Sequence, residues 1–244
     1  MEKQKKGHIH PITSMIQEIN SIFFDMGFEI ANGPEMESEY YNFDALNIPE
    51  NHPARDMQAT FWIKGKKKTV LRTHVSNIQV RYMEGNKPPF KIVYLGRAFR
   101  NEATDSTHEA QFHQFETLVI GKDINLSNMK AVITTFIKKV FGNDVKIRMR
   151  PGFFPFVEPG MEVDISCFKC DGTGYCSICK NTGWIEVLGA GMVHPNVLKN
   201  GRIDPKEWQG FAFGVGLDRI VMLKYKINDI RLLYNGDLRF VQQF

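Results

Sequence analysis

The stretch FRNEATDSTHEAQFHQFETLVI, residues 99–120, combines the residue types of two β-strands with an unusual density of charge. Aromatic and β-branched residues indicate strands at 91–99 and 110–120, and NEATDSTHE between them is rich in turn-forming residues. We therefore predict a long hairpin. Its charged groups do not suit an ordinary core strand, because burying an unpaired charge is costly.

Strand alternation sorts this hairpin into two faces, since successive side chains point to opposite sides of a sheet. Phe112, Gln114 and Glu116 share one face of the second strand, whereas His113 and Phe115 share the other. His113 is therefore expected to point away from any site on the polar face.

The same spacing of two residues recurs elsewhere and predicts one polar sheet face with aromatic rings among its charges. It is found at Arg100 and Glu102, at His74 and Ser76, and at Phe154, Phe156 and Glu158. Arginine matches phosphate or carboxylate, carboxylates and amides suit an ammonium group, and phenylalanine suits a flat ring. A solvated surface is the alternative. The combination favours a ligand with a phosphate, an amine and a ring.

Length and composition bound the class of protein. The chain has 244 residues, 43% hydrophobic content and a net charge of +4, which fits one large domain and permits contact with a polyanion. No apolar run is long enough to span a membrane, and residues 1–10 form a basic lead-in that lacks the apolar core of a secretory signal. We expect a reduced, cytoplasmic protein without a membrane partner.

The remaining pattern predicts an α+β domain with an antiparallel sheet flanked by helices. Helices are expected at 12–27, ending at Gly27, at 127–141, capped by Ser127, and at 217–226. A long loop is expected over 35–60, a hairpin with GKKK at its tip over 60–76, and a turn at FFPFVEPG. Further strands are expected at 145–151, 161–166, 184–192 and 211–216. No internal repeat is detected.

The segment FGVGLDRIVML, residues 213–223, places two glycines before a helix. Gly214 and Gly216 allow a ligand to approach the backbone, and the start of a helix favours anions. Arg219 lies one turn into that helix and could reach a phosphate or stack on a base. This is not a dinucleotide fingerprint, because a third glycine at the required spacing is missing.

All four cysteines fall within one short segment, CFKCDGTGYCSICKNTGW. Cys167, Cys170, Cys176 and Cys179 form two CxxC pairs, which can hold Zn²⁺ through four thiolates. An iron–sulfur or redox role and four free thiols are the alternatives. We expect a small structural zinc-knuckle insertion at 167–183, because four sulfur ligands leave no open position for chemistry.

These motifs resemble those of class II aminoacyl-tRNA synthetases. GFEIANGP is similar to their motif 1, FRNE with QFHQFE to motif 2, and FGVGLDR to motif 3. Longer blocks resemble the family of bacterial-type phenylalanyl-tRNA synthetase α subunits: YNFDALNIPENHPARD, RTHVSNIQVR, FFPFVEPGMEVD, LGAGMVHPNVL, GFAFGVGLDR and DIRLLYNGDLRFVQQF. The resemblance implies that residues 11–244 form a class II catalytic domain.

The resemblance implies a ligase that activates phenylalanine with ATP and transfers it to tRNA(Phe). By motif position, Arg100 would bridge the α-phosphate and the substrate carboxylate, Glu102 would bind the adenine amino group, and His108 would contact the phosphates. Phe112 and Arg219 would sandwich the adenine, with Gly216 on the ATP side. Arg100, His108 and Arg219 are thus the expected catalytic residues. The expected ATP-binding set is Arg100, Glu102, His108, Phe112, Gly216 and Arg219.

The resemblance also implies a phenylalanine pocket. Its ammonium and carboxylate ends would be held by His74, Ser76, Gln114 and Glu116, with Trp62 nearby. Phe154 and Phe156 would meet the ring, Ala212 would close the pocket beyond it, and Gly214 would lie beside it. A small residue at 212 leaves little room for a tyrosine hydroxyl. Mg²⁺ would accompany ATP, with Glu158 as a possible ligand.

The family works as an α₂β₂ heterotetramer, so a β subunit is an expected partner, together with an α–α contact through the motif 1 region. Its members carry an N-terminal coiled-coil arm that helps to bind tRNA. Only about ten residues precede the matching blocks, so we expect a truncated chain or a lineage without the arm. Two other functions remain open: a paralogue that activates an amino acid without charging tRNA, and a zinc-bearing nucleic-acid-binding module.

Overall fold

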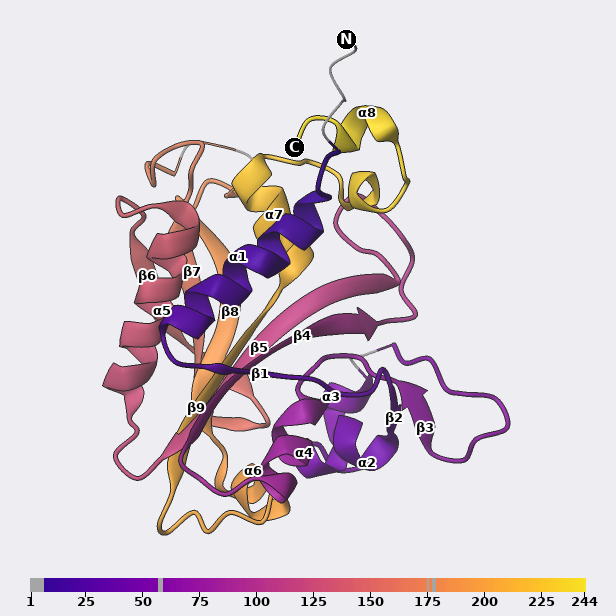
Figure 1. Cartoon of the computed structure of the whole chain (residues 1–244), viewed down its shortest axis with the longest axis vertical. Coiled ribbons are helices and arrows are strands. Elements are labelled where there is room, and N and C mark those ends of the chain that lie inside the picture. Colours follow the sequence, from indigo (N-terminus) through magenta and orange to yellow (C-terminus); the bar gives the residue numbers. More distant parts are fainter. Residues whose placement is uncertain (1–6, 57–58, 175, 177–178) are drawn as a thin grey trace.

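The structure, a computed structural model, describes residues 7–56, 59–174, 176 and 179–244, so part of the lead-in and of the cysteine segment lies outside it. In the described part, a sheet of seven strands runs in the order β1-β4-β5-β9-β8-β7-β6 (Figure 1). β1 is parallel to β4, and the other neighbouring pairs are antiparallel. The strands are β1 (Glu29–Ala31), β4 (Phe90–Phe99), β5 (Gln111–Gly121), β6 (Ile147–Phe154), β7 (Val157–Ser166), β8 (Trp184–Val193) and β9 (Gln209–Gly216).

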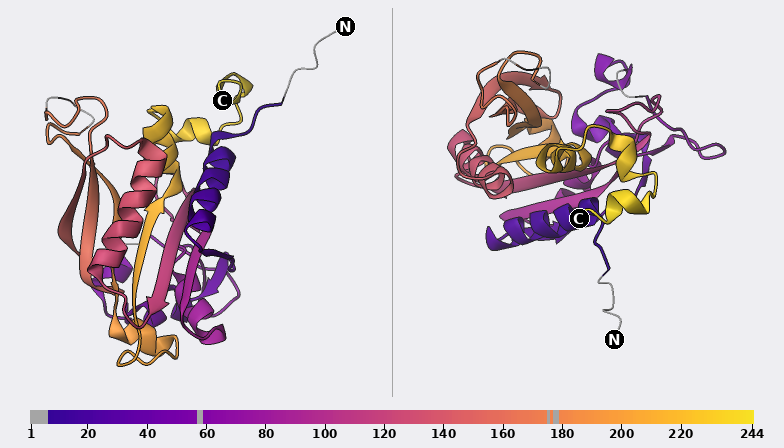
Figure 2. Two further views of the ribbon diagram at one scale, coloured as in Figure 1. Left: turned by 60° about the vertical axis from the view of Figure 1, so that its left-hand side comes forward. Right: turned by 90° about the horizontal axis from the view of Figure 1, so that it is seen from above.

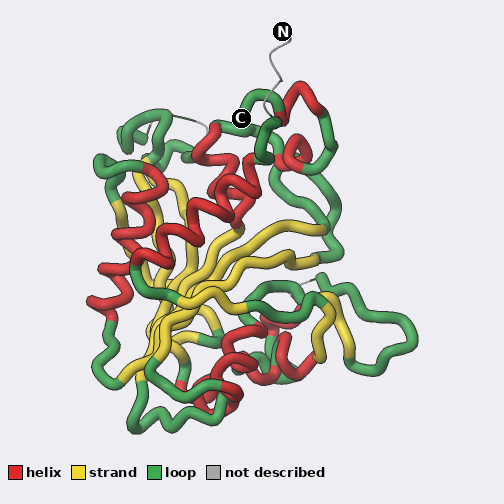
Figure 3. Tube along the Cα trace, in the orientation of Figure 1, coloured by secondary structure: helices red, strands yellow, loops and turns green. Residues whose placement is uncertain are grey.

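Helices cover both faces of this sheet, which confirms the predicted α+β class. On one face lie α1 (Pro11–Asp25), α5 (Leu126–Phe141) and α7 (Leu217–Tyr225). Figure 2 shows α1 and α5 running along the strands. The opposite side carries α2 (Glu39–Asn42), η1 (Asp44–Leu46), α3 (Pro53–Asp56), α4 (Asn77–Gly85) and α6 (Pro195–Asn200). Figure 3 shows the strands as a layer between the two groups.

Strand alternation produces two separate apolar cores. Val93 and Phe115 pack into the core below α1, α5 and α7, whereas their chain neighbours Ile92 and Tyr94 pack into the core on the α4 side. His113 is two residues from Phe115 in β5, so it lies on the same face, and it contacts Tyr234. The prediction that it points away from the polar face is confirmed.

The predicted hairpin of residues 99–120 is confirmed, with one correction at its end. β4 and β5 pair in continuous register from Phe90↔Ile120 to Phe99↔Gln111. The strand ends at Phe99, so Arg100 and Glu102 lie beyond it and not on its face. Arg100 still donates its backbone N–H to the Ala110 carbonyl, at 2.9 Å, which anchors it beside β5.

The predicted N-terminal helix is confirmed, and local chemistry explains both of its ends. Pro11 occupies the first helical position, and the His10 ring accepts the Ile12 N–H. After the helix, Gly27 has φ +76°, and the N–H groups of Gly27 and Phe28 donate to carbonyls of the last turn. These two hydrogen bonds and the left-handed conformation of Gly27 end the helix as predicted.

Several expectations were wrong in detail. Asn125, not Ser127, caps α5, because its side chain accepts the N–H groups of Ser127 and Asn128. The turn expected at FFPFVEPG is short, since β6 continues to Phe154 and β7 begins at Val157. Phe154, Phe156 and Glu158 therefore do not lie along one strand.

The segment between β1 and β4 also differs from the prediction. Residues 35–56 are not a loop but contain β2 (Met36–Ser38), α2, η1 and α3. The expected hairpin at GKKK is reduced to a bridge between Trp62 and Val70, because β3 (Thr69–Leu71) pairs with β2 instead. No helix in the described residues is long and apolar enough to cross a bilayer.

Candidate active site

A cavity of about 680 Å³ opens on the α4 side of the sheet, at the middle of β5, β9 and β8. Nine predicted site residues line it, which brings together segments from across the chain. They are His74, Ser76, Arg100, Gln114, Glu116, Phe154, Phe156, Ala212 and Gly214. The strand parity of β5 therefore placed Gln114 and Glu116 on the correct face.

Glu116 is the centre of the polar end of the cavity. Its side chain is 8% exposed and accepts three hydrogen bonds, from the Ser76 hydroxyl, the Gln79 amide at 2.9 Å and the Tyr94 hydroxyl at 2.8 Å. Burial raises the pKa of this carboxyl, and the three donors oppose that rise. The result is a fixed acceptor in a site from which most water is excluded.

Ser76 and His74 reach the cavity from an irregular segment, not from the strand that the spacing predicted. Ser76 stands immediately before α4, and Gln114 accepts the neighbouring Val75 N–H at 3.2 Å. This contact attaches the segment to β5. The segment is also held from behind, where Asn42 accepts the Thr73 N–H at 3.1 Å.

His74 is the least satisfied polar group of the cavity. It is 5% exposed, and neither ring nitrogen has a hydrogen-bond partner in the described part of the chain. Burial, followed by the nearby positive charge of Arg100, lowers the pKa of His74 to about 3. A neutral imidazole that lines a cavity and leaves both nitrogens buried and unpaired is a group that a polar ligand would satisfy.

Arg100 supplies the positive charge at the entrance to this polar end. Its Nε donates to the Thr73 carbonyl at 3.2 Å, and its guanidinium lies over the Phe112 ring at 5.0 Å. Burial lowers the pKa of Arg100, and the arginine has no carboxylate ion pair in the described residues. It is therefore available to an anionic ligand.

The apolar end of the cavity depends on small residues in β8 and β9. A Cβ on Gly214 would lie 2.2 Å from Cγ of Glu116, and a Cβ on Gly189 would lie 2.8 Å from the Phe154 ring. These glycines therefore make the room that the two side chains occupy. Phe154 and Phe156 stack with their ring centroids 6.0 Å apart.

The remaining residues expected to bind ATP lie outside the cavity lining but around one edge of it. Phe112 is the nearest, below Arg100. Glu102 and His108 belong to the exposed connection between β4 and β5, where Asp105 accepts the backbone N–H groups of Thr107 and His108. This bonding orders the connection into a turn.

Arg219 lies in the first turn of α7. Its Nε donates to the Glu186 carbonyl at 3.2 Å, and its side chain remains exposed. Gly216 pairs with Gln114 across β9 and β5, so the start of α7 stands directly beside the cavity. Phe112 and Arg219 thus come from adjacent strand ends.

Two predicted residues lie apart from the cavity. Trp62 is 56% exposed and pairs with Val70 instead of lining the site. Glu158 lines a neighbouring pocket of about 190 Å³, together with His194 and His52. That pocket shares Phe154 with the main cavity.

Sequence reasoning missed several residues of the cavity. Gln79 and Tyr94 bind Glu116 directly, but Gln79 comes from α4, which the sequence did not reveal, and Tyr94 lies in the middle of an apolar strand. His52, to which we assigned no role, lines the cavity, and its ring is parallel to that of Phe153. Pairing the alternating strand QFHQFE with the neighbouring strand KIVYLG would have placed Tyr94 opposite Glu116 and so identified it.

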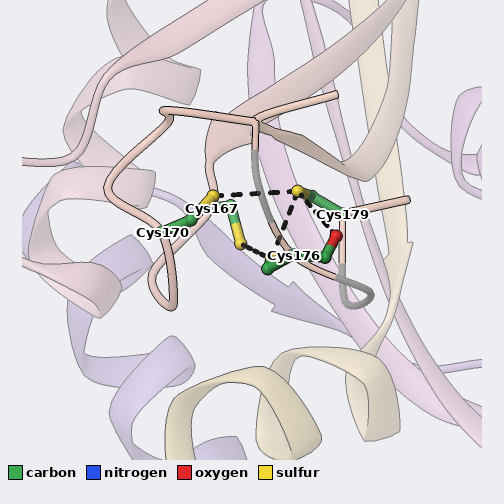
Figure 4. Close-up of side chains that lie close together, drawn as sticks. All are labelled: Cys167, Cys170, Cys176 and Cys179. Carbon is green, nitrogen blue, oxygen red and sulfur yellow. Dashed lines mark hydrogen bonds between the residues drawn. The ribbon is translucent and has the colours of Figure 1, made fainter. Parts of the chain in front are cut away.

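The four cysteines converge beyond the ends of β7 and β8 (Figure 4). Their sulfur atoms all lie within 4.8 Å of one another. Tetrahedral zinc with Zn–S bonds of about 2.3 Å requires sulfur separations of about 3.8 Å, so the cluster fits this ion. The sulfur atoms are separated by 3.5 Å for Cys167–Cys176, 3.7 Å for Cys170–Cys179 and 3.3 Å for Cys176–Cys179, close to this requirement.

The cysteine segment also contains an internal repeat, contrary to our expectation. CFKCDGTG at 167–174 and CSICKNTG at 176–183 match at a spacing of nine residues. Their backbones match as well: φ is +48° at Asp171 and +50° at Lys180, and +87° at Gly174 and +79° at Gly183. Two similar loops therefore each present one CxxC pair.

Known proteins are similar to this chain over nearly its whole length. The family model for the tRNA synthetases class II core domain (F) matches residues 1–244. The phenylalanine–tRNA ligase alpha subunit of Alkaliphilus metalliredigens (strain QYMF) is 55% identical over 238 residues, covering 98% of this chain and 69% of the relative. The protein of the same name from Bacillus cytotoxicus is 55% identical over 237 residues, covering 96% of this chain and 68% of that relative.

The sheet, the arginine-lined cavity and the family model together define a class II tRNA synthetase core domain. Within that class, the chain belongs to the family of phenylalanine–tRNA ligase alpha subunits.

Proposed function

We propose that this chain is the catalytic subunit of a phenylalanine–tRNA ligase, which activates phenylalanine with ATP and transfers it to tRNA(Phe). The observation that carries the proposal is the cavity, which has a hydrogen-bonded carboxylate at one end and two phenylalanine rings at the other. An amino acid with an aromatic side chain has the complementary arrangement of groups. Membership in the phenylalanine–tRNA ligase family supports the same substrate.

Phenylalanine would lie with its ammonium group toward Glu116 and its ring toward Phe154 and Phe156. Glu116 is held by three donors, so it can accept from an ammonium group without reorganising. His74 and Gln114 would contact the polar end of the substrate. Ala212 is 3% exposed and lies at the closed end of the cavity, where it would limit the length of the bound ring.

ATP would bind at the edge of the cavity beside Arg100 and Phe112, and Arg219 would reach it from the first turn of α7. The substrate carboxylate attacks the α-phosphorus, the bond to pyrophosphate breaks, and phenylalanyl-adenylate forms. Because the carboxylate is already a nucleophile, the protein contributes position and charge instead of a side-chain nucleophile. Arg100 has the required freedom from ion pairing to stabilise the charge that develops at phosphorus. Glu102, His108 and Gly216 would complete the nucleotide site.

Two metal ions belong to the proposal. Mg²⁺, bound with ATP, would neutralise phosphate charge. We assign Glu158, which lines the neighbouring pocket, to this ion as a ligand. Zn²⁺ would be held by Cys167, Cys170, Cys176 and Cys179, whose sulfur geometry fits a closed tetrahedral site. We assign the zinc a structural role, because four protein ligands leave it no position for a substrate.

The partners would be ATP, L-phenylalanine, tRNA(Phe) and a β subunit in an α₂β₂ assembly that works in the cytoplasm. The relatives named alpha subunits support the presence of a second type of subunit. Three strongly exposed apolar side chains, Phe24, Ile30 and Met36, lie in or next to the motif 1 region, where an α–α contact was expected.

The test is the charging of tRNA(Phe) by the chain together with its β subunit. Arg100→Ala is expected to lower kcat by about 100-fold or more, the cost of removing a preorganised donor to a transition state. The matched control is Arg239→Ala, which removes a 91%-exposed arginine side chain far from the cavity. Loss of charging in the control, or full charging by Arg100→Ala, would contradict the proposed role of Arg100.

A further inference from the structure

A turn near the C-terminus contacts three segments that carry proposed ATP-binding residues: the β4–β5 connection, β5 and α7. This turn is η2 (Ile230–Leu233) with Tyr234 after it. On one side, the Ile230 N–H donates to the Ser106 carbonyl at 2.9 Å, inside the connection that bears Glu102 and His108. Ile230 is 5% exposed, which makes this a fixed contact.

On its other side, the turn reaches the chain neighbours of Phe112 and Arg219, the two residues that would flank the adenine in the proposed site. The Tyr234 hydroxyl donates to Oδ1 of Asp218, and Asp218 is the residue immediately before Arg219. The second oxygen of Asp218 accepts the backbone N–H of His113 at 2.6 Å, and His113 immediately follows Phe112.

The link is closed by the His113 side chain. Its Nδ1 lies 3.1 Å from the Tyr234 hydroxyl, and the two rings stack with centroids 6.3 Å apart and planes within 7°. Asp218 is 2% exposed, so its charge is stabilised by these donors and not by water. One oxygen of this buried carboxylate thus joins the start of α7 to the start of β5, and the other oxygen binds Tyr234.

We propose that Tyr234 and Asp218 are positioning residues that fix the nucleotide half of the active site. Tyr234 holds Asp218, and Asp218 sets the distance between the strand end bearing Phe112 and the helix start bearing Arg219. The contact of Ile230 with Ser106 places the β4–β5 connection relative to the same turn. The phenylalanine half of the cavity makes none of these contacts in the described residues, so its affinity is independent of them. This inference rests on the proposed ATP site.

The test variant is Tyr234→Phe, which keeps the ring stacking and removes the hydroxyl. Measured with the β subunit present, the KM for ATP in phenylalanine-dependent ATP–pyrophosphate exchange should rise about ten-fold, as for the loss of one hydrogen bond to a charged group. The KM for phenylalanine should remain unchanged. Equilibrium binding of ATP should weaken by the same factor as the KM.

The matched control is Tyr225→Phe, because Tyr225 also packs near the C-terminus, with its ring 5.0 Å from that of Phe244. It should leave both KM values unchanged. A second variant, His113→Phe, removes one hydrogen bond and keeps a stacked ring, so it should give a smaller rise in the KM for ATP.

The results separate the two proposals. Unchanged ATP affinity in Tyr234→Phe, or equal losses for ATP and phenylalanine, would overturn the positioning role while leaving the proposed function intact. If the wild-type assembly neither binds ATP nor exchanges pyrophosphate, the proposed function fails and this inference fails with it.

Discussion

At the scale of single residues, the cavity is defined by a few side chains whose surroundings are unusual. Glu116 is a buried carboxylate with three donors, and His74 is a buried imidazole whose ring nitrogens have no hydrogen-bond partner among the described residues. Positions 189 and 214 have room only for glycine, because adjacent side chains occupy the space that a Cβ would need. Each of these features leads to a measurable consequence.

Gly189→Ala should weaken the binding of phenylalanine. The new Cβ would lie 2.8 Å from the Phe154 ring, which has to move from its place beside the cavity. We expect the KM for phenylalanine to rise roughly ten-fold or more, because small displacements in a preorganised site are costly. Steady-state exchange kinetics measure this. Gly85→Ala is the control, since its Cβ would meet nothing within 4 Å. An unchanged KM in Gly189→Ala would show that the Phe154 ring does not form the pocket.

His74 should make the protein less stable in acid. Its pKa is lowered from 6.5 to about 3 in the folded state, so the unfolded chain binds a proton more readily between those values. The contribution of neutral His74 to the free energy of unfolding is thus fully present above pH 6.5 and is lost as the pH falls toward 3. The slope should approach about 1.4 kcal/mol per pH unit. Urea unfolding of the wild type and His74→Gln across this range measures the difference, and identical pH profiles would show that His74 takes up a proton in the folded state.

At the scale of elements, the long strands and helices were predictable because their patterns are local. The hairpin of β4 and β5 follows from alternation, and α1 follows from apolar spacing and its terminal glycine. The segment between β1 and β4 was not predictable in the same way. Its helices are short and lack periodicity. β3 pairs with β2 across residues 39–68, and no local pattern reveals a pairing at that separation.

The site shows the same division. Gln114 and Glu116 were predictable from strand parity, whereas Gln79 binds Glu116 only because α4 packs over the sheet. His74 and Ser76 were expected on a strand, and they line the cavity from an irregular segment instead. The spacing thus selected residues that do line the cavity, but for an incorrect structural reason.

The start of α5 provides a test at this scale. Asn125→Ala should reduce the free energy of unfolding by about 1 kcal/mol, because the side chain satisfies two N–H groups of the first turn. Ser127→Ala is the matched control and should have little effect, since Ser127 contributes only its backbone N–H to the cap. Chemical denaturation of both variants decides between the caps. A larger fall in the free energy of unfolding for Ser127→Ala would show that Ser127 is the cap, as the sequence suggested.

At the scale of the whole molecule, one sheet separates two cores and carries chemistry on one of its faces. The core below α1, α5 and α7 includes Phe23, Phe115 and Phe136, which pack as a cluster of rings. The opposite face carries the cavity over the same strands. The cysteine knuckle lies beyond β7 and β8, and the buried Cys167 and Cys179 join the first core.

Zinc removal should therefore destabilise the protein without acting on the cavity directly. We expect one zinc per chain by elemental analysis, and a lower Tm after chelation, because four ligands join the two similar loops. Cys179→Ser should lower the Tm in the same direction, and added zinc should restore the chelated wild type but not the variant. Absence of bound zinc in protein purified without chelator, with an unchanged Tm in Cys179→Ser, would contradict the structural role.

The central claim is that this cavity activates phenylalanine, and phenylalanine-dependent ATP–pyrophosphate exchange tests it most directly. The assay uses the chain with its β subunit and compares phenylalanine with tyrosine and leucine. We predict exchange with phenylalanine, much weaker exchange with the other two amino acids, and none after Arg100→Ala. A folded assembly that shows no exchange with phenylalanine, or equal exchange with leucine, would contradict the account.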